Sequence, residues 1–280
     1  KRVDKAMIRD ITIGQYYPAK SILHRLDPRV KLVSTLLYLI SLFLFRSMAG
    51  YLAATLFLIG VIRASKVPFG YIVKGLKPVV MLLMITVVFN LFLKKEGEVL
   101  VHVWRLTITT VGLRNAVYMA VRLIYLIIGS SLMTFTTTPN ELTDGIEALL
   151  APLNKLRVPV HEVAMMMSIA LRFIPILLEE TDKIMKAQQA RGADFESGNI
   201  MQRAKAMIPI LVPLFVSAFR RANDLAMAME ARCYRGGEGR TKMKPLRYRG
   251  RDLTAYVVMF AYVIAVVAIG RYVPLKVWIF

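Results

Sequence analysis

Residues 253–270 read LTAYVVMFAYVIAVVAIG, and this stretch decides the class of fold. None of its residues is charged, and its length is close to the roughly 20 apolar residues that a helix needs to cross a bilayer core. The whole chain has 280 residues, of which 56% are hydrophobic, and its mean hydropathy is +0.53. Soluble domains of this size need more polar surface. The sequence therefore predicts an all-α integral membrane protein.

Four further apolar segments precede this one and are long enough, or nearly long enough, to span a membrane. They are residues 30–45, 47–62, 78–93 and 116–137. Only Arg46 separates the first two, which predicts a tight helical hairpin, and the third is expected to extend back to Tyr71. With the segment at 253–270, we expect about five transmembrane helices.

Residues 160–178 and 207–216 are also apolar, but charges or prolines interrupt them. Glu162 and Arg172 lie within the first, and Pro209 and Pro213 lie within the second, whose apolar run is only about ten residues. We interpret both as amphipathic or partly buried helices. One apolar stripe at helical spacing supports this for the first segment: Val163, Met166, Met167, Ala170, Leu171, Ile174 and Leu178.

The distribution of cations predicts the orientation, because cytoplasmic loops of membrane proteins collect Lys and Arg. With the N-terminus in the cytoplasm, residues 1–29, 63–77 and 138–252 hold 29 Lys and Arg, against 7 in the outside parts. The net charge of +20 therefore has a topological cause, and nucleic acid is not an expected partner. The outside segment 94–116 still carries four cations, namely Lys94, Lys95, Arg105 and Arg114.

The long segment before the last span is predicted to be helical. A short helix is expected at 142–150 after a start signal at 138–141, and a long one at 160–190, with a kink at Pro175 and a stop at Gly192. A second long helix is expected at 200–232. The chain then divides into an N-terminal region with four spans (1–137), a cytoplasmic domain (138–252) and a last span with its tail (253–280).

Motifs of catalysis are missing from this sequence. The nearest match to a phosphate-binding loop, residues 70–75, lacks the Gly-Lys-Ser/Thr continuation. Cys233 is the only cysteine, and the three histidines have no partner at ligand-like spacing, so we expect neither a metal site nor a cofactor. Glu179 and Glu180 point about 100° apart on a helix and are interpreted as a solvated face. The chain is not expected to be an enzyme.

Two stretches at the predicted ends of the long helices are similar to each other: AQQARG at 187–192 and AMEARC at 228–233. A cation near a helix C-terminus interacts favourably with the helix dipole, worth about 0.3–1 kcal/mol. That accounts for one Arg at each end. It does not account for the small Ala190 and Ala231 beside Arg191 and Arg232, which leave both tips slim enough to enter a groove.

These motifs resemble those of the transmembrane (T) component of energy-coupling factor transporters. The resemblance extends over nearly the whole chain. It rests on LHRLDPRVKL at 23–32, LRFIPILLEET at 171–181, AQQARG at 187–192 and AMEARCYRG at 228–236. The second copy departs from the family pattern at Cys233, where glycine or serine is more usual.

The resemblance implies a non-catalytic coupling subunit of the cell membrane. Its two long cytoplasmic helices would cross, and their tips would bind two ABC-type ATPase subunits, which bind the ATP. The implied ATPase-binding residues are Ala190, Arg191, Gly192, Ala231, Arg232 and Cys233. A substrate-binding S component would be a further partner, with Met165, Met166 and Met167 as candidate contacts or, alternatively, as ordinary core residues. The usual cargo of the family is a vitamin, with nickel or cobalt in dedicated systems.

Several residues keep two interpretations at this stage. The row Ala218, Ala222 and Ala226 has a spacing suited to a close helix crossing. Arg122, inside the fourth span, either reaches the outer interface or pairs within the bundle. The basic run from Arg232 to Arg251 favours anionic lipid headgroups over an extra ATPase contact. The rival to a coupling subunit is a self-sufficient membrane protein, either a secondary transporter or an enzyme of the lipid surface, but no repeat or mid-membrane acid supports a transporter.

Overall fold

The computed structural model describes residues 16–45, 47–93, 99–103, 106–195, 199–237 and 243–272. The chain forms two compact units. The first, here called the bundle unit, consists of residues 13–148 and 246–280, and the second, here called the helix-pair unit, contains residues 149–245. The bundle unit is therefore built from two parts of the chain that the helix-pair unit separates.

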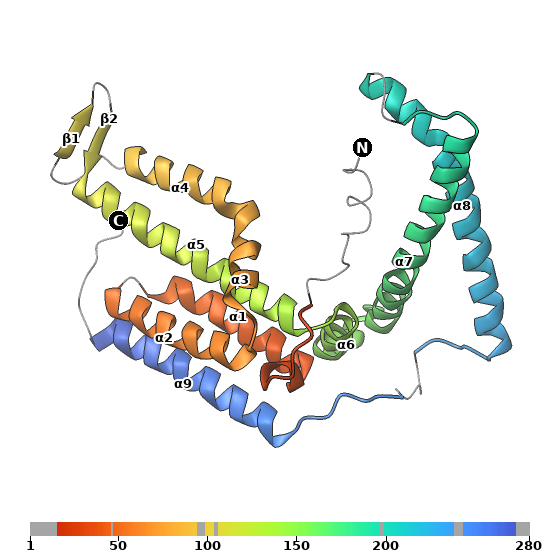
Figure 1. The fold of residues 1–280 in the computed structure, drawn as a ribbon. Coiled ribbons are helices and arrows are strands. Elements are labelled where there is room, and N and C mark those ends of the chain that lie inside the picture. The colour runs from red at the N-terminus through yellow and green to blue at the C-terminus, as the bar shows by residue number, and fades with distance from the viewer. Residues whose placement is uncertain are drawn as a thin grey trace. The chain divides into compact units, whose positions relative to one another are not determined.

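The bundle unit is helical except for one hairpin (Figure 1). Its described elements, in chain order, are η1 (Leu23–Arg25), α1 (Pro28–Leu44), α2 (Met48–Ser65), α3 (Phe69–Leu76), η2 (Lys77–Val79), α4 (Val80–Leu93), β1 (Val99–Val103), β2 (Leu106–Thr109), α5 (Thr110–Thr136), α6 (Pro139–Leu150) and α9 (Gly250–Tyr272). Helix α5 contacts α1, α2, α3 and α4, while α9 contacts α1 and α2. The centre of this unit is therefore α5, and α9 completes it from the other end of the sequence.

The helix-pair unit contains the end of α6, η3 (Ala151–Leu156), α7 (Val160–Ala190) and α8 (Ile200–Ala231). The predicted bounds of the two long helices, 160–190 and 200–232, agree with α7 and α8 within one residue. Helix α7 continues through Pro175, and α8 continues through Pro209 and Pro213, which do not interrupt it. Asn199 and Gln202 form a capping box that begins α8.

Five described helices are long and apolar enough to cross a membrane. The sequence predicts this number, but these helices are not all the segments that it predicts to span. They are α2, α5, α7, most of α8, and α9. Helices α1 and α4, which match two of the expected spans, have 17 and 14 residues and fall below this length. Composition alone does not distinguish a membrane-spanning helix from a helix whose apolar face binds a partner. We interpret α7 and α8 as helices of the second kind.

The third expected span differs most from its prediction. Instead of one helix from Tyr71 to Leu93, the chain forms α3, the short 3₁₀ turn η2 and α4, which meet at an angle (Figure 1). Pro78 lies in the first turn of η2, where its missing N–H removes one hydrogen bond of a continuous α-helix.

A two-stranded antiparallel hairpin follows α4 and was not predicted from the sequence. Its register pairs Val103 with Leu106 and Val99 with Thr109, with an irregularity between Val99 and Val101. The all-helical class is confirmed for the bulk of the fold, and the hairpin is an addition to it. Lys94, Lys95 and Arg105, which weakened the predicted orientation, lie outside the described residues.

Local signals begin the helices of the bundle. Asp27 is the N-cap of α1 and accepts a hydrogen bond from the N–H of Arg29, while Pro28 occupies the first helical position. Ser47 caps α2 and Thr109 caps α5 in the same way. Thr138 and Glu141 form a reciprocal capping box at the start of α6, as the sequence signal at 138–141 predicts.

The starts of α1 and α9 are joined through one buried carboxylate. Asp252, 3% exposed, accepts hydrogen bonds from the N–H of Asp27 at 2.9 Å and from the N–H of Arg249 at 2.7 Å. Arg29 forms an ion pair with Asp27 at 2.8 Å, and its guanidinium lies 3.9 Å from the centroid of the Tyr248 ring. Desolvation acts to raise the pKa of Asp27, but hydrogen bonds from Arg29 and the charges of Arg29 and Lys31 outweigh it and lower the pKa.

The end of α5 is fixed to α1 by a buried lysine. The Nζ of Lys31, in a side chain only 7% exposed, donates to the carbonyl oxygen of Thr136 at 2.8 Å and to that of His24 at 3.4 Å. Carbonyl oxygens in the last turn of a helix have no partner within the helix, and a cation there is favourable. Lys31 therefore closes the end of α5 while it remains part of α1.

Aromatic rings fill the middle of the bundle. The rings of Phe57 in α2 and Tyr262 in α9 stack at 4.1 Å between centroids, and Tyr38 in α1 lies 5.8 Å from Phe57. The hydroxyl groups of Ser41 and Tyr262 are 3.1 Å apart. Tyr38 also packs closely against α5. A Cβ added at Gly129 of α5 would lie 2.5 Å from Cε1 of Tyr38, so only glycine allows this approach.

Arg122 contacts an aromatic ring within the bundle, which is one of the two arrangements expected for it. Its guanidinium lies 5.5 Å from the centroid of the Phe43 ring, near the end of α1 that is remote from Asp27. A cation over an aromatic face is favourable, and here it places the charge at the level of the connection between α1 and α2.

We predict that Gly129→Val destabilises the bundle by about 1–3 kcal/mol, because the new side chain would displace the Tyr38 ring from α5. The measurement is thermal unfolding of the detergent-purified chain, followed by circular dichroism. Gly270→Val is the matched control, since a Cβ at Gly270 meets nothing within 4 Å. Equal melting temperatures for the two variants would contradict this account of the packing.

Candidate functional site

The C-terminal end of α7 closes in a Schellman motif. Arg191 is the C-cap residue, and Gly192 follows it with φ +89°. The N–H of Gly192 donates to the carbonyl oxygen of Gln189, and the N–H of Ala193 donates to that of Gln188, both at 3.0 Å. This pair of hydrogen bonds defines the motif, and glycine is the residue best suited to the left-handed position.

The end of α8 has the same geometry. Arg232 is the C-cap residue, the N–H of Cys233 donates to the carbonyl oxygen of Glu230 at 2.8 Å, and the N–H of Tyr234 donates to that of Met229 at 3.0 Å. Cys233 has φ +56°, a left-handed conformation that a residue with a Cβ rarely adopts. The departure from glycine at this position therefore leaves the fold of the helix end unchanged.

Both arginines are free to bind a partner. The residues Ala190, Arg191, Gly192, Ala231, Arg232 and Cys233 are all exposed. In the described part of the chain, neither guanidinium has a hydrogen-bond or ion-pair partner, although each can donate up to five hydrogen bonds in a planar fork. Each tip therefore presents an unused charge beside an alanine of minimal bulk.

The two tips lie at opposite ends of an antiparallel pair. Gln188 near the end of α7 donates to the carbonyl oxygen of Pro209 near the start of α8 at 3.5 Å. At the other end, a Cβ on Gly237, just after α8, would meet the ring of His161 in the first turn of α7. Because α7 has 31 residues and is about 46 Å long, Arg191 and Arg232 are well separated.

An ion pair between α7 and α8 fixes the two helices together, and it was not predicted from the sequence. Glu180 in α7 accepts from Nη2 of Arg221 in α8 at 2.7 Å, and both side chains are partly buried. The interpretation of Glu180 as a purely solvated residue was therefore wrong. The two partners are 41 positions apart, and no local spacing rule connects them.

The alanine row of α8 does not line the crossing. Ala222 and Ala226 are exposed, and Ala218 is half-buried. The partly or fully buried positions of α8 include Ile210, Leu214, Ser217 and Arg221. The contact with α7 therefore uses a neighbouring face, and the prediction of a close crossing at the alanine row was wrong.

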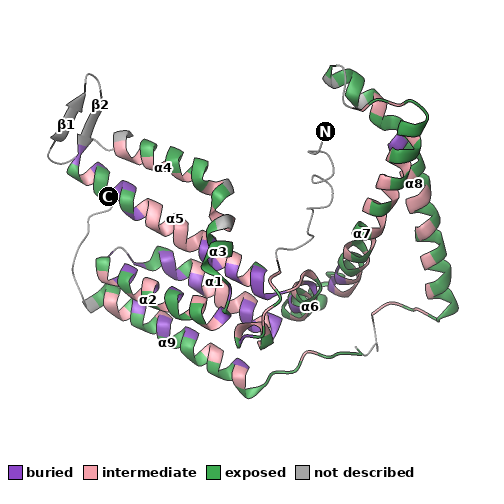
Figure 2. Cartoon of the chain, viewed as in Figure 1, coloured by how far each residue is buried: buried purple, intermediate pink, exposed green. Residues whose placement is uncertain are grey.

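The apolar stripe of α7 is offered to the surroundings rather than buried. Met166 and Met167 are 58% and 50% exposed, and Met165 is half-buried. The described residues of α7 that are fully buried are Val160 and Ala164 alone (Figure 2). Helix α8 exposes apolar side chains of its own, among them Leu211, Phe215, Val216 and Phe219. Packing within the described part of the chain therefore leaves Met166 and Met167 largely exposed.

Metal chemistry has no support among the residues that the structure describes. No group of three or more His, Cys, Asp or Glu side chains in those ranges is placed to hold a metal ion. What the helix-pair unit presents is two cationic tips and an exposed apolar surface, which is an arrangement suited to binding other proteins.

We predict that Cys233→Gly stabilises the end of α8 by about 0.5–1 kcal/mol, because glycine adopts positive φ without steric cost. Gly192→Ala, the reciprocal change at φ +89°, is expected to destabilise α7 by a similar amount. Amide hydrogen exchange in the last turns of both helices measures the two effects separately. Unchanged protection in both variants would contradict the assigned helix-end geometry.

Comparison with known proteins assigns the family. A family model described as "CbiQ: Cobalt transport protein" matches residues 19–243. The relative from Clostridium kluyveri is 58% identical over 250 residues, covering 89% of this chain and 93% of its own length. The relatives from Thermosediminibacter oceani and Bacillus subtilis are 52% and 49% identical, covering 97% and 90% of this chain and 100% and 95% of their own lengths. All three are named "Energy-coupling factor transporter transmembrane protein EcfT". The chain therefore belongs to the family of energy-coupling factor transporter transmembrane proteins, as a multi-pass membrane component of a transporter.

Proposed function

We propose that this chain is the coupling subunit of an energy-coupling factor importer, and that its two helix tips bind two ABC-type ATPase subunits. The observation that carries the proposal is the repetition of one motif. Arg191 and Arg232 occupy the same C-cap position of the same Schellman motif at opposite ends of one helix pair, and both are exposed and have no side-chain partner among the described residues. Two equivalent tips suit two equivalent receptor grooves.

The chemistry of the tips fits this role. A guanidinium that binds a carboxylate or carbonyl oxygens forms charge-assisted hydrogen bonds worth about 1.5–3 kcal/mol each. Ala190 and Ala231 keep the helix ends narrow, so that the arginine can reach into a groove without steric conflict. The chain itself would remain non-catalytic, with ATP bound and hydrolysed by the partner subunits.

The packing of the helix pair supports transmission of motion. The ion pair of Glu180 with Arg221 links α7 to α8, so that displacement of one tip is carried to the other helix. The exposed Met166 and Met167 lie on the same unit, and methionine surfaces repack readily against a partner that changes orientation. We therefore assign the surface around Met165, Met166 and Met167 to a substrate-binding S component.

The orientation follows from the charge distribution. The excess of Lys and Arg at 138–252 supports a cytoplasmic position of the helix-pair unit, where the ATPases would have access to ATP. The N-terminus would lie on the same side of the cell membrane.

The cargo of the transporter has two candidates. Vitamins or similar micronutrients are the first, because the relatives carry the energy-coupling factor name. Cobalt or nickel is the second, because the matching family model is described as a cobalt transport protein. Uptake of radiolabelled vitamins and of ⁵⁷Co by cells that express the complete transporter distinguishes the two.

We predict that Arg191→Glu combined with Arg232→Glu leaves the chain folded in the membrane but abolishes co-purification of the ATPases and ATP-dependent uptake. Each substitution replaces a cationic hydrogen-bond donor with a carboxylate, which would repel the acceptor oxygens of the receptor groove. Arg191→Lys with Arg232→Lys retains charge but loses the planar fork, so partial assembly with impaired uptake is expected. Full assembly and uptake with both glutamates present would refute the docking role and favour a self-sufficient transporter.

We predict a different outcome for Met166→Glu combined with Met167→Glu, measured in the same co-purification. These charges would disrupt an apolar contact but lie away from the tips, so the ATPases are expected to remain bound while the S component is lost. Met243→Glu is a control, because Met243 is 95% exposed and lies outside α7 and α8. Loss of the ATPases, or retention of the S component, would show that the methionine surface has another role.

A further inference from the structure

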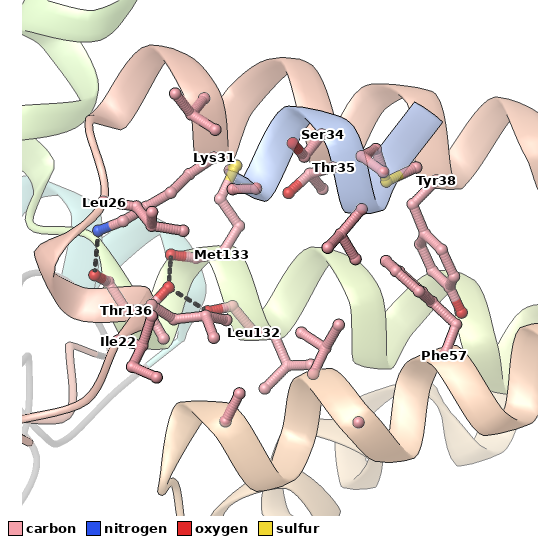
Figure 3. A pocket seen from close by; sticks show the side chains of 18 of the residues that line it. Ile22, Leu26, Lys31, Ser34, Thr35, Tyr38, Phe57, Leu132, Met133 and Thr136 are labelled. Carbon is pink, nitrogen blue, oxygen red and sulfur yellow. Dashed lines mark hydrogen bonds between the residues drawn. The ribbon is translucent and has the colours of Figure 1, made fainter. Parts of the chain in front are cut away.

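A cavity of about 440 Å³ lies within the bundle unit, between α1, α2, α5 and α9. This volume is in the range of about 300–1,000 Å³ typical of small-molecule sites. Every lining residue belongs to the bundle unit, and most are apolar. Figure 3 shows Lys31, Ser34, Thr35 and Tyr38 along α1, with Leu132, Met133 and Thr136 of α5 nearby.

The position of the cavity along the helices is defined by its lining. It uses the first part of α1 and of α9 and the last part of α2 and of α5, with Lys31 and Arg251 at the N-terminal ends of α1 and α9, and Thr136 at the end of α5. These ends lie together because Asp252 joins α9 to α1 and Lys31 joins α1 to α5. The cavity therefore occupies one half of the bundle, at the end where Asp252 of α9 binds the N–H of Asp27 at the start of α1. We call this junction the latch.

The polar groups are concentrated at that end. Arg251 is a half-buried residue, and its guanidinium has no hydrogen-bond or ion-pair partner in the described ranges. Lys31 donates to two carbonyl oxygens and so retains a third N–H. The Oγ of Ser34 is buried and also lacks a partner among the described residues, which is costly unless a ligand supplies one.

The charge around this end is positive. The stretches 25–31 and 249–252 meet at the latch and contain five cations, namely Arg25, Arg29, Lys31, Arg249 and Arg251. The acids near them are Asp27, Glu141 and Asp252. Asp27 is already paired with Arg29, and Asp252 accepts from two backbone amides, so a negative group beside Arg251 would meet a net positive field.

The rest of the cavity is apolar and reaches the molecular surface. Leu56 of α2 and Val258 of α9 line it and are 70% and 58% exposed, so the cavity opens where the bundle faces lipid. Small residues create the space: Gly60 and Ala64 in α2 and Ala255 in α9. A Cβ built on Gly60 meets no atom within 4 Å, which shows that the space beside it is empty of protein.

We propose that this cavity binds one anionic phospholipid of the surrounding leaflet. Its phosphate contacts Arg251 and the polar end of the cavity, and one acyl chain lies along the apolar wall formed by α1, α2, α5 and α9. An amphiphile matches both parts of the lining, since one end is cationic with unused donors and the remainder is hydrocarbon. A soluble ligand would leave the apolar wall in contact with water, and an alkane would leave Arg251 and Ser34 without partners.

The test uses the full chain in a non-ionic detergent, with lipid binding measured by native mass spectrometry. Dioleoyl-phosphatidylglycerol is the anionic probe, and dioleoyl-phosphatidylcholine is the neutral one. The wild type is expected to bind one phosphatidylglycerol about fivefold or more tightly than phosphatidylcholine, and Arg251→Gln is expected to remove about that factor, the scale of one cation near an anionic lipid. Gly60→Leu fills the cavity and is expected to abolish binding of both lipids at this site.

Two variants serve as matched controls on the same helix. Arg271→Gln removes an exposed cation at the far end of α9, and Gly270→Leu adds a side chain where nothing lies within 4 Å. Both are expected to bind phosphatidylglycerol as the wild type does. Equal binding of the two lipids by the wild type, or unchanged phosphatidylglycerol affinity in Arg251→Gln, overturns the proposal. The Arg251→Gln comparison decides the matter even when Gly60→Leu fails to fold, which thermal unfolding reports.

Discussion

The bundle unit depends on one hydrogen bond that crosses 225 positions of sequence, from the N–H of Asp27 to the carboxylate of Asp252. The chain leaves the bundle after α6, forms the helix-pair unit and has to return for α9 to complete the core. Asp252 is suited to hold the return because it accepts simultaneously from α1's capping residue and from the N–H of Arg249. A buried carboxylate is stable only when such donors satisfy it, so the bond fixes both helix starts at once. Fixing the start of α9 also sets the position along the bundle at which the Tyr262 ring stacks on the Phe57 ring.

The same end of the bundle joins packing to charge. Lys31 uses its ammonium group to satisfy the carbonyl oxygen of Thr136, the last residue of α5, within the buried part of the bundle. Small residues such as Gly129 allow α5 to approach α1 closely, whereas Gly60 in α2 faces open space. The cavity therefore lies beside closely packed helices, at the end of the bundle where the cations are concentrated. This arrangement connects the structural latch to the lipid site that we propose.

The helix-pair unit is stabilised differently, because most of its described residues are exposed or half-buried. Its stability comes from helix ends that satisfy their own backbone groups and from the ion pair between Glu180 and Arg221. The left-handed φ of Cys233 shows that the Schellman geometry at α8 is retained even where the residue disfavours it. Both helix ends thus place an arginine at an equivalent point of the backbone, and the exposed apolar face between them has no partner within the described part of the chain. These two features are the basis on which we propose that the unit binds other proteins.

The sequence alone determined the membrane class, the bounds of α7 and α8 and the capping box of α6, because these depend on composition and on residues within a few positions of one another. It also located Arg191 and Arg232 at helix ends, since Gly192 and the pair Gly236 and Gly237 are local stop signals. Only the tertiary structure decided the pairing of Glu180, the exposure of the alanine row, the hairpin before α5, the bond to Asp252 and the cavity beside Gly60. Each of these depends on which side chains meet across long separations in sequence, and helical periodicity defines a face without defining what packs against it.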